Sequence, residues 1–340
     1  MFFRLLLIGI RMNKITAAIV TYSERAHFVE TVVGECIKQG VCDFVIIDNG
    51  SSNENNSKLN SIKTRYSDVK ISIIRNDTNE GSAPGFKKAI KIASEINKED
   101  GWVFVLDDDN KPRDNCVNNL LFVSNKMGGE ERVYSCFRDD REHYIKFLET
   151  LDNDFILGPK NSFMAFSISN YIKNKIKKKS KNINKKNGFH KEVVTIPCAP
   201  YGGIFFKSSI IDKIGLPNAD LYLYFDDTEY TLGMASKGVE ILLVTDSRVQ
   251  DIDESWTLNK NKQRFHSPYL EGSEVKSIYS FRNRVYLERK YLVTNSLMYV
   301  INIVSLMIII GIKAIVRCKM KRYFALCKAI VDGWNMASLK

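Results

Sequence analysis

Three consecutive carboxylates, Asp107, Asp108 and Asp109, directly follow the apolar run at residues 102–106. Like charges within one turn repel each other unless a cation or several hydrogen-bond donors lie among them, and hard divalent ions select carboxylate oxygens. In an extended segment the side chains at 107 and 109 share a face, while 108 points the other way. The spacing predicts that Asp107 and Asp109 bind one divalent ion. A solvated acidic turn after a buried strand is the structural alternative.

A second acidic cluster, Asp226, Asp227 and Glu229, follows the aromatic-rich run at 221–225. A carboxylate that faces the first cluster could take a proton from an attacking hydroxyl group. Carboxylates also stabilise the first turn of a helix, and we expect a helix to begin at Thr228, so capping is the structural alternative. One of these side chains could do both.

The first acidic cluster belongs to an alternating pattern of strands and helices. Residues 15–21, 42–48, 69–75 and 102–106 are expected to form strands, and residues 26–39, 56–66 and 84–97 to form helices. This alternation predicts an α/β fold with a doubly wound, mostly parallel sheet. Ligands bind such sheets at the carboxyl ends of the strands, where Thr21, Asp48, Asn79 and Asp107 are expected.

These strand ends suggest a nucleotide site. Asp48 could accept a hydrogen bond from a uracil or thymine ring or from a ribose hydroxyl, with Thr21 and Tyr22 beside the base; a turn capped by Asp48 is the alternative. The loop from Asn79 through Gly81 to residue 85 opens a helix, where small residues and free N–H groups favour a negatively charged group. A plain strand-to-helix connection would look the same.

Composition narrows the classes of partner. The chain has 340 residues, 44% of them hydrophobic, and its 50 Lys and Arg residues against 39 Asp and Glu give a net charge of +11. Eight lysines lie between residues 173 and 186, and further basic residues at 317–322 follow an apolar stretch. No aromatic residues alternate with that first run, as base stacking would require, so we expect a membrane surface and no nucleic acid as partner. A solvated loop is the alternative.

The ends of the chain and its cysteines point to a cytosolic location. Seven cysteines without a Cys-x-x-Cys pair favour reduced thiols. The apolar residues 1–11 are too short for a spanning helix and lack a cleavage site, so secretion is not expected, and Met12 is an alternative start.

With these motifs in order, residues 14–290 resemble glycosyltransferase family 2, closest in style to its rhamnosyltransferase and galactofuranosyltransferase branch. The resemblance rests on the segments at 20–25, 47–51, 79–85, 106–109, 202–203 and 225–230. It implies a GT-A fold over residues 13–255, with a donor half at about 13–112 and an acceptor half at about 113–255. It also implies Mn²⁺ or Mg²⁺ on Asp107 and Asp109, Asp227 as general base, and inversion of the anomeric centre.

The resemblance assigns the remaining site residues to one of the two substrates. The expected donor-binding residues are Thr21, Tyr22, Arg25, Asp48, Asn79, Gly81 and Asp108. The expected acceptor-binding residues are Gly202, Gly203, Asp226 and Glu229.

Two departures from the family pattern concern the metal and the substrates. Family members usually carry a metal-binding histidine after the acidic helix, but residues 245–253 contain none. Gln250 or Asp251 could replace it, or His266 could reach in from later in the chain. The family also tends to place arginine where Gly233 stands.

Residues 256–340 are expected to form a helical C-terminal region. An amphipathic, basic helix is expected at 281–291, and residues 297–316 are nearly all apolar, interrupted by Asn302, Ser305 and Lys313. About 20 such residues could cross a bilayer. We favour a membrane-associated segment at about 294–316, interfacial or re-entrant, over a core helix.

The sequence thus predicts an inverting, metal-dependent hexosyltransferase in surface polysaccharide biosynthesis. It would move a sugar from UDP-galactofuranose, another UDP-sugar or dTDP-rhamnose to a lipid-linked glycan acceptor at the cytoplasmic face of the inner or plasma membrane. A sugar nucleotidyltransferase should carry a Gly-rich, Arg-bearing loop after the first strand, unlike residues 22–25. A non-enzymatic basic membrane-surface protein would leave both carboxylate clusters unexplained.

Overall fold

The computed structural model describes residues 14–98, 100–128, 131–176, 191–253 and 267–338. Most of the lysine-rich run and the alternative metal ligand His266 lie outside the described residues.

The described residues form a nine-stranded sheet in the order β3-β2-β1-β4-β8-β6-β9-β5, with β7 paired to β9. The strands are β1 (Ile15–Thr21), β2 (Asp43–Asn49), β3 (Lys70–Asn76), β4 (Trp102–Asp107), β5 (Asn110–Pro112), β6 (Val133–Phe137), β7 (Val193–Thr195), β8 (Ile204–Lys207) and β9 (Ile241–Asp251). Strands β3, β2, β1 and β4 are parallel, and β8 runs antiparallel between β4 and β6. The predicted α/β GT-A-like fold is therefore confirmed, with a mixed sheet in which parallel pairing predominates.

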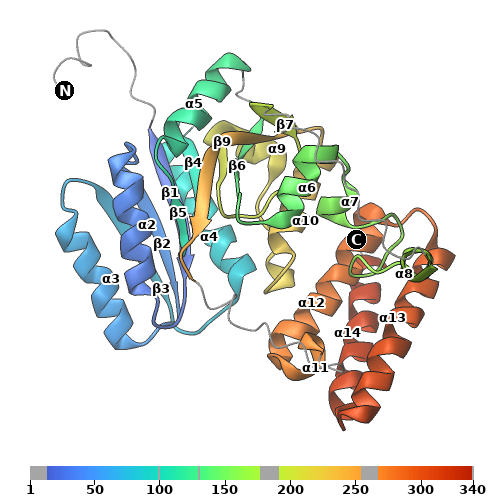
Figure 1. Cartoon of the computed structure of the whole chain (residues 1–340). Helices are drawn as coiled ribbons and strands as arrows, with labels where there is room; N and C mark the ends of the chain where they lie inside the picture. The colour runs from blue at the N-terminus through green and yellow to red at the C-terminus, as the bar shows by residue number, and fades with distance from the viewer. Residues whose placement is uncertain (1–13, 99, 129–130, 177–190, 254–266, 339–340) are drawn as a thin grey trace.

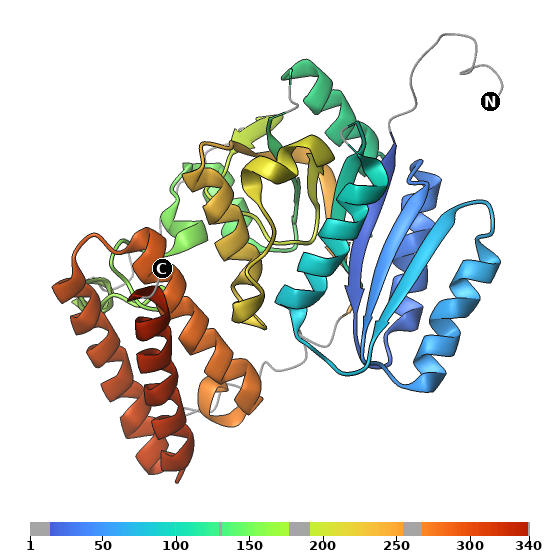
Figure 2. The same cartoon turned by 180° about the vertical axis from the view of Figure 1, so that it is seen from behind.

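Helices cover both faces of the sheet. The helices before β9 are α2 (Ala26–Lys38), α3 (Asn53–Arg65), α4 (Ser82–Asn97), α5 (Cys116–Lys126), α6 (Glu142–Thr150), α7 (Asp154–Leu157), α8 (Ile168–Ile176), α9 (Ile211–Ile214) and α10 (Asp226–Ser236). Of these, α8 lies away from the sheet, beside the C-terminal helices. Helices α2 and α3 lie in front of the sheet in Figure 1, and α4 lies behind it, as Figure 2 shows from the other side.

Helices α3, α4 and α10 begin earlier than predicted, and local contacts account for the start of α3 and of α10. Helix α3 begins at Asn53 because the Ser52 hydroxyl caps it, accepting from the Asn55 N–H at 3.1 Å. Helix α10 begins at Asp226 rather than Thr228, so the acidic cluster lies in its first turn, where helix-end N–H groups favour negative charge.

Alternating side chains of the central strands build a core on each face. In β4, Phe104 and Leu106 pack with α2 and α5, while Val103 and Val105 pack with α4 and α10. Asp107 continues the row of Val103 and Val105. The last residue of β4 is thereby directed to the face on which α10 begins.

One edge of the sheet collects the polar residues. Because β8 is antiparallel to both β4 and β6, those two strands are parallel to each other, and β9 is parallel to β6. The carboxyl ends of β1, β4, β6 and β9 and the amino end of β8 therefore meet at the same edge.

The C-terminal region is helical. It contains α11 (Pro268–Glu271), α12 (Glu274–Leu287), a π-helical turn (Glu288–Leu292), α13 (Ser296–Val316) and α14 (Met320–Ser338). These helices share a core of their own and lie beside the end of α10, at the lower right of Figure 1. Buried Glu288 connects them to the preceding part of the chain, since it accepts from the Met164 N–H at 3.1 Å. The division at residue 255 stays a prediction.

Candidate active site

The acidic triplet lies at the carboxyl end of β4, and its members have different partners. Asp107 is half-buried, and no hydrogen bond or ion pair joins its carboxylate to another described residue. Burial, and then the charge of Asp109, raises the pKa of Asp107 to about 7. Asp107 thus has no direct ion-pair partner among the described residues, and the nearby charge of Arg138 offsets the rise in its pKa only in part.

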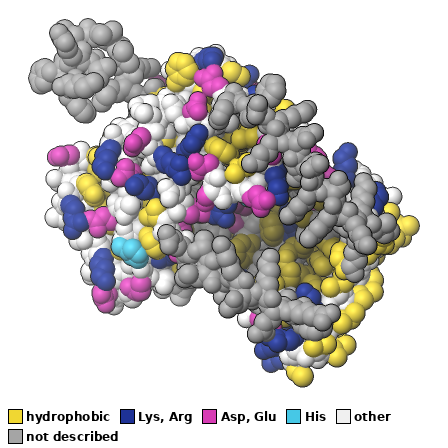
Figure 3. Space-filling view, viewed as in Figure 1, with side chains coloured by type: hydrophobic (Ala, Val, Ile, Leu, Met, Phe, Trp, Pro, Cys, Tyr) yellow, Lys and Arg dark blue, Asp and Glu magenta, His cyan; other side chains and the backbone are white. Residues whose placement is uncertain are grey.

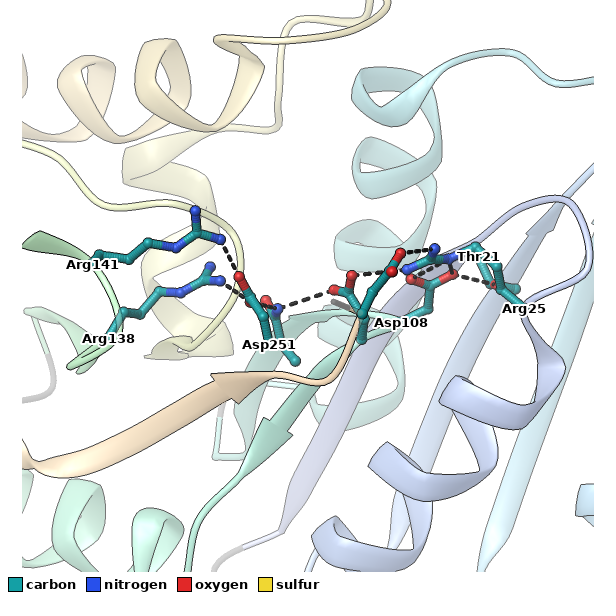
Figure 4. A network of polar contacts seen from close by, with 9 residues as sticks. Thr21, Arg25, Asp108, Arg138, Arg141 and Asp251 are labelled. Atoms are coloured by element: carbon teal, nitrogen blue, oxygen red, sulfur yellow. Dashed lines mark hydrogen bonds and ion pairs between the residues drawn. The ribbon is translucent and has the colours of Figure 1, made fainter. Parts of the chain in front are cut away.

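Asp108 and Asp109 are held by Arg25, which lies just before α2. The Arg25 Nε donates to Asp108 at 2.9 Å and its Nη2 donates to Asp109 at 2.8 Å, while Nη1 contacts Asp253 at 2.6 Å. The Thr21 hydroxyl also donates to Asp108, at 2.7 Å. Figure 4 shows the Arg25 guanidinium surrounded by these carboxylates. Arg25, predicted to bind the sugar donor, therefore pairs with two of the three carboxylates of the triplet in this structure.

The network continues to the end of β9, as Figure 4 shows from right to left. The Asn110 amide donates to Asp109 at 3.1 Å and to Asp251 at 2.8 Å. Arg138 and Arg141 both pair with Asp251. Asp251, one of the two oxygen ligands considered in place of the missing histidine, thus lies at the site but is neutralised by two arginines, whereas Gln250 is exposed.

Two side-chain oxygens near Gly202 bear on whether a divalent cation fits beside Asp107. Asp107 Oδ2 and the buried, unpartnered Oδ1 of Asn110 both lie within 3.0 Å of the position that a Cβ on Gly202 would occupy, so only glycine fits there. In the described part of the chain, no three His, Cys, Asp or Glu side chains are arranged to hold an ion alone. An ion at Asp107 and Asp109 would need further oxygens from a ligand, and Asp109 would share its charge with Arg25.

A cavity of about 410 Å³ opens beside Asp107. It is lined by residues from both halves of the predicted catalytic domain, including Tyr22, Asn49, Asn79, Gly81, Ser82, Asp107, Asp108, Tyr201, Tyr222, Asp226 and Asp227. Asp48 lies beneath this surface: its carboxylate is fully buried and accepts from the Ser51 N–H at 3.1 Å and the Asn56 amide at 2.9 Å. These contacts agree with the structural alternative for Asp48, in which its carboxylate caps the turn that follows β2.

Asn49, the next residue, organises the predicted phosphate loop. Its amide donates to the Gly81 carbonyl at 2.8 Å and to the Asn79 side chain at 3.1 Å, and its Oδ1 accepts from the Glu80 N–H at 2.9 Å. Gly81 has φ of +91°, and a Cβ there would come within 2.2 Å of the Tyr222 carbonyl. The loop is thereby fixed against the segment that leads into the second acidic cluster.

That segment, residues 221–225, is strained. Tyr222, Tyr224 and Phe225 all have positive φ, which non-glycine residues rarely adopt. Its carbonyls are held by Asn283 of α12, whose amide nitrogen lies 2.8–2.9 Å from the carbonyls of Leu221, Leu223 and Tyr224. The C-terminal region therefore supports the turn that presents Asp226 and Asp227.

Asp226 is buried and Asp227 is half-buried, and the two aspartates differ in their contacts. Asp226 accepts from the Ser82 hydroxyl at 2.9 Å, and burial together with the charge of Asp227 raises its pKa to about 7. Asp227 accepts from the N–H of Thr228 at 2.6 Å. Burial raises the pKa of Asp227 as well. A carboxylate with a raised pKa that is still ionised is a stronger base than an exposed one.

Asp227 also borders a second cavity, of about 280 Å³. This cavity is lined by Arg138, Arg141, His143, Tyr144, Ile156, Cys198, Ala199, Pro200, Asp227 and Thr228. The carboxylate of Asp227 thus lies between two cavities, one reaching the acidic triplet and the other reaching two arginines.

The remaining predicted residues lie around these cavities. Gly203, with φ of +105°, packs against Cys136. It therefore contributes to the packing of the sheet edge. Glu229 points away from both cavities into a third, where it pairs with Lys290 at 2.7 Å and accepts from the Tyr291 hydroxyl. Gly233 lines this third cavity too.

Sequence reasoning missed Asn49, Arg138, Arg141 and Asn283. Arg138 directly follows the buried strand β6, the same signal that marked Asp107 after β4. Asn283 carries no sequence signal of its own, because its role depends on three distant carbonyls.

Comparison with known proteins identifies relatives. The profile of glycosyl transferase family 2 matches residues 16–215. The curated dTDP-rhamnosyl transferase RfbF of Shigella flexneri is 24% identical over 280 residues, covering 82% of this chain and 81% of that protein. The fold is similar to the mannosyltransferase PcManGT of Pyrobaculum calidifontis, solved with GDP-Man and Mn²⁺, with a TM-score of 0.53 and 13% identity over 96% of this chain and 88% of that one.

A second solved structure shares the fold over part of its length. GalNAc-T7, solved with UDP, GalNAc and Mn²⁺, gives a TM-score of 0.51 with 15% identity over 83% of this chain. The present chain spans 48% of that protein.

Proposed function

Because the chain belongs to glycosyl transferase family 2, a family of enzymes that use nucleotide-sugar donors, we propose that it transfers one sugar from a nucleotide diphosphate to a glycan hydroxyl, with inversion. The observation that carries this proposal is the position of Asp227 between two cavities. One cavity would take the donor and the other the acceptor. The family assignment argues against the sugar nucleotidyltransferase and the non-enzymatic membrane protein.

The 410 Å³ cavity is the proposed donor site. Asp107 and Asp109 would hold Mn²⁺ or Mg²⁺, which supplies charge neutralisation of the departing diphosphate when bound. Tyr22, Asn79 and Gly81 line this cavity and would contact the nucleotide. Thr21 and Arg25 act indirectly in this proposal, since both hold Asp108 in place. Asp48 would contribute to the donor site indirectly, by holding the turn that positions Asn49.

Asp227 is the proposed base. It would accept the proton of the acceptor hydroxyl while that oxygen attacks the anomeric carbon from the face opposite the diphosphate. A single base suffices for such a displacement. The Asp226 carboxylate, hydrogen-bonded to Ser82, would position the turn rather than take the proton.

The donor is proposed to be dTDP-rhamnose, UDP-galactofuranose or another UDP-sugar. The relative named dTDP-rhamnosyl transferase supports the first of these. The acceptor is proposed to be a lipid-linked glycan, because an apolar surface on α13 could hold the enzyme at a membrane.

Helix α13 is long and apolar enough to cross a bilayer, with mean hydropathy of 2.3. One side of it is buried against the other C-terminal helices, and the opposite side exposes an apolar stripe: Leu297, Ile301, Val304, Ile308, Ile312 and Ile315. Figure 3 shows hydrophobic side chains gathered over these helices. The spacing of three or four residues places the stripe along one helix face.

The charged residues of helix α14 favour an interfacial position of α13. It packs along α12 and α13 and carries Lys321, Lys328 and Asp332. A spanning α13 would draw these charges toward hydrocarbon, at a cost of about 2.5–3.5 kcal/mol for each at the bilayer centre. An α13 that lies in the headgroup region on its exposed stripe avoids this cost. We therefore propose peripheral attachment at the cytoplasmic face.

Nucleotide binding tests this function. The melting temperature of the full chain should rise with UDP or dTDP, and the rise should be larger with Mn²⁺, whereas ADP should give no comparable effect. A ligand at 100 times its Kd stabilises the folded state by about 2.7 kcal/mol. The absence of any nucleotide effect with Mn²⁺ would contradict the proposal. A screen of the three donor types against a lipid-linked glycan extract would then identify the sugar.

A further inference from the structure

The 280 Å³ cavity on the far side of Asp227 has a basic wall. Arg138, Arg141 and His143 line it, and Asp227 is the acidic residue among its lining groups. Arg138 directly follows β6 and therefore lies at the same sheet edge as Asp107. The wall thus stands close to the point where the proposed acceptor hydroxyl would lose its proton.

Arg138 is a buried cation with an unused donor. The residue is 6% exposed, and its Nε is buried without a hydrogen-bond partner. Leaving a buried charged donor unsatisfied destabilises the folded protein. Arg138 also lines the cavity, so a ligand there would lie against this cation.

One carboxylate holds both arginines. Arg138 and Arg141 each pair with Asp251, which also accepts from Asn110. Figure 4 shows the two guanidinium groups side by side on Asp251. A second carboxylate, that of Asp140, lies 3.6 Å from the guanidinium group of Arg141, the more exposed of the two arginines. Asp251 thereby orients the pair, as a fixed partner orients a binding residue.

The electrostatic environment agrees with a basic wall. Burial lowers the pKa of His143, and the charges of Arg141 and Arg138 lower it further. An uncharged His143 can donate to or accept from a neutral sugar hydroxyl while the arginines hold an anion.

We propose that this cavity recognises an anionic group on the acceptor, a carboxylate or a phosphate, and that Arg138 and Arg141 bind it so that a neighbouring hydroxyl reaches Asp227. The inference rests on the proposed function and specifies its acceptor. Guanidinium groups match both anions in geometry, since each can be bound by two parallel N–H donors. A neutral sugar would offer hydroxyl oxygens to the arginine donors but no negative charge.

Binding of small anions to the full chain provides the test. Glucuronate, inorganic phosphate and glucose, each at constant ionic strength, are titrated calorimetrically into the wild type, Arg141→Gln and Arg113→Gln. Arg141 and Arg113 are matched, because their side chains are 41% and 40% exposed and each pairs with an aspartate, but Arg113 does not line the cavity. Arg138→Lys retains the buried charge but replaces the guanidinium fork by a single ammonium group, and should also weaken anion binding; unchanged anion affinity in this variant would contradict a role for Arg138.

The expected result is that glucuronate or phosphate binds the wild type more tightly than glucose does. Arg141→Gln should weaken that binding by roughly 10-fold, as the loss of one charge-assisted hydrogen bond predicts. Arg113→Gln should leave it unchanged. A preference for glucuronate identifies a carboxylate acceptor, and a preference for phosphate identifies a phosphorylated one.

Three results would overturn the inference: equal affinity in Arg141→Gln and wild type, glucose binding as tightly as the anions, or weaker binding of UDP and dTDP with Mn²⁺ in Arg141→Gln. The last would assign the arginines to the donor diphosphate. Nucleotide binding by the wild type is read separately, so failure of the proposed function is distinguishable from failure of this inference.

Discussion

The side-chain amide of Asn283 lies 2.9 Å from the main-chain carbonyl of Tyr224, two residues before Asp226. The same nitrogen lies 2.8 Å from the carbonyls of Leu221 and Leu223. A residue of the C-terminal region therefore holds the strained turn that leads into the proposed base. The helical C-terminal region and the proposed active site are thus in direct contact at this point.

Asn283→Ala should reduce both stability and turnover. The variant leaves three carbonyls of a positive-φ segment without their donor, and each lost hydrogen bond contributes about 0.5–1.5 kcal/mol. Urea unfolding should give a loss of about 2–4 kcal/mol, and kcat should fall more than nucleotide affinity. Asn60→Ala, on the exposed face of α3, is the control. An unchanged kcat would show that the turn keeps its shape without Asn283.

Arg25→Met should destabilise the protein, because it leaves the nearly buried Asp108 without its ion-pair partner. Removal of one member of a buried ion pair costs about 3–5 kcal/mol. Mn²⁺ should recover part of this loss, since a cation on the neighbouring carboxylates replaces the missing charge. Calorimetry with and without Mn²⁺ measures both effects. Arg65→Met removes an exposed pair with Glu30 and should cost less than about 1 kcal/mol. Equal losses in the two variants would contradict this role of Arg25.

Asp226→Asn should stabilise the metal-free protein at high pH. The folded pKa of Asp226 is about 7, above its usual 3.8, so the folded state binds more protons between these values and stability falls as pH rises through them. The variant lacks this loss and keeps the contact to Ser82. Its melting temperature should exceed that of the wild type by at least about 2–4 °C at pH 8, for roughly 1 kcal/mol, and by less at pH 5. Asp246→Asn, at an exposed position, should show no such trend. A gap between Asp226→Asn and the wild type that does not widen with pH would refute the assignment.

Ile308→Asp should weaken membrane binding without unfolding the protein. Ile308 lies in the middle of the α13 stripe and is 57% exposed, so a charge there meets the headgroup boundary rather than the core. Flotation with vesicles rich in anionic lipid should show reduced binding, whereas Phe122→Asp, at a 61% exposed site on α5, should bind like the wild type. Equal binding of both variants would place the membrane contact elsewhere.

Local sequence patterns were enough to predict the sheet edge. Apolar runs that end in Thr21, Asp48 and Asp107 predicted three parallel strands, and β1, β2 and β4 confirm them to within one residue. These strands could be predicted because the apolar residues of each strand indicate that the strand is buried. The antiparallel insertion of β8 between β4 and β6 carries no local signal, since partner choice depends on distant residues.

The sequence predicted those site residues whose charged side chains directly follow a strand. It did not predict which side chains would be used in contacts within the protein. Asp107 and Asp227 face a common cavity, in line with their predicted roles, which themselves stay predictions. Asp48 and Arg25 have the expected residue types, yet their side chains bind the protein itself. Tertiary packing determines which carboxylate or guanidinium groups find hydrogen-bond partners within the protein. The local sequence around each residue does not contain this information.

The most direct test is transfer by Asp227→Asn, with the donor and acceptor extract that support turnover in the wild type. Asparagine preserves the shape of the side chain but cannot accept the proton. Donor nucleotide with Mn²⁺ should bind the variant within about 2-fold of the wild type, while transfer should fall by roughly 10²–10⁴-fold. Asp246→Asn serves as the control. Full turnover by Asp227→Asn would contradict the assignment of the base and, with it, the division of the site into donor and acceptor cavities at this residue.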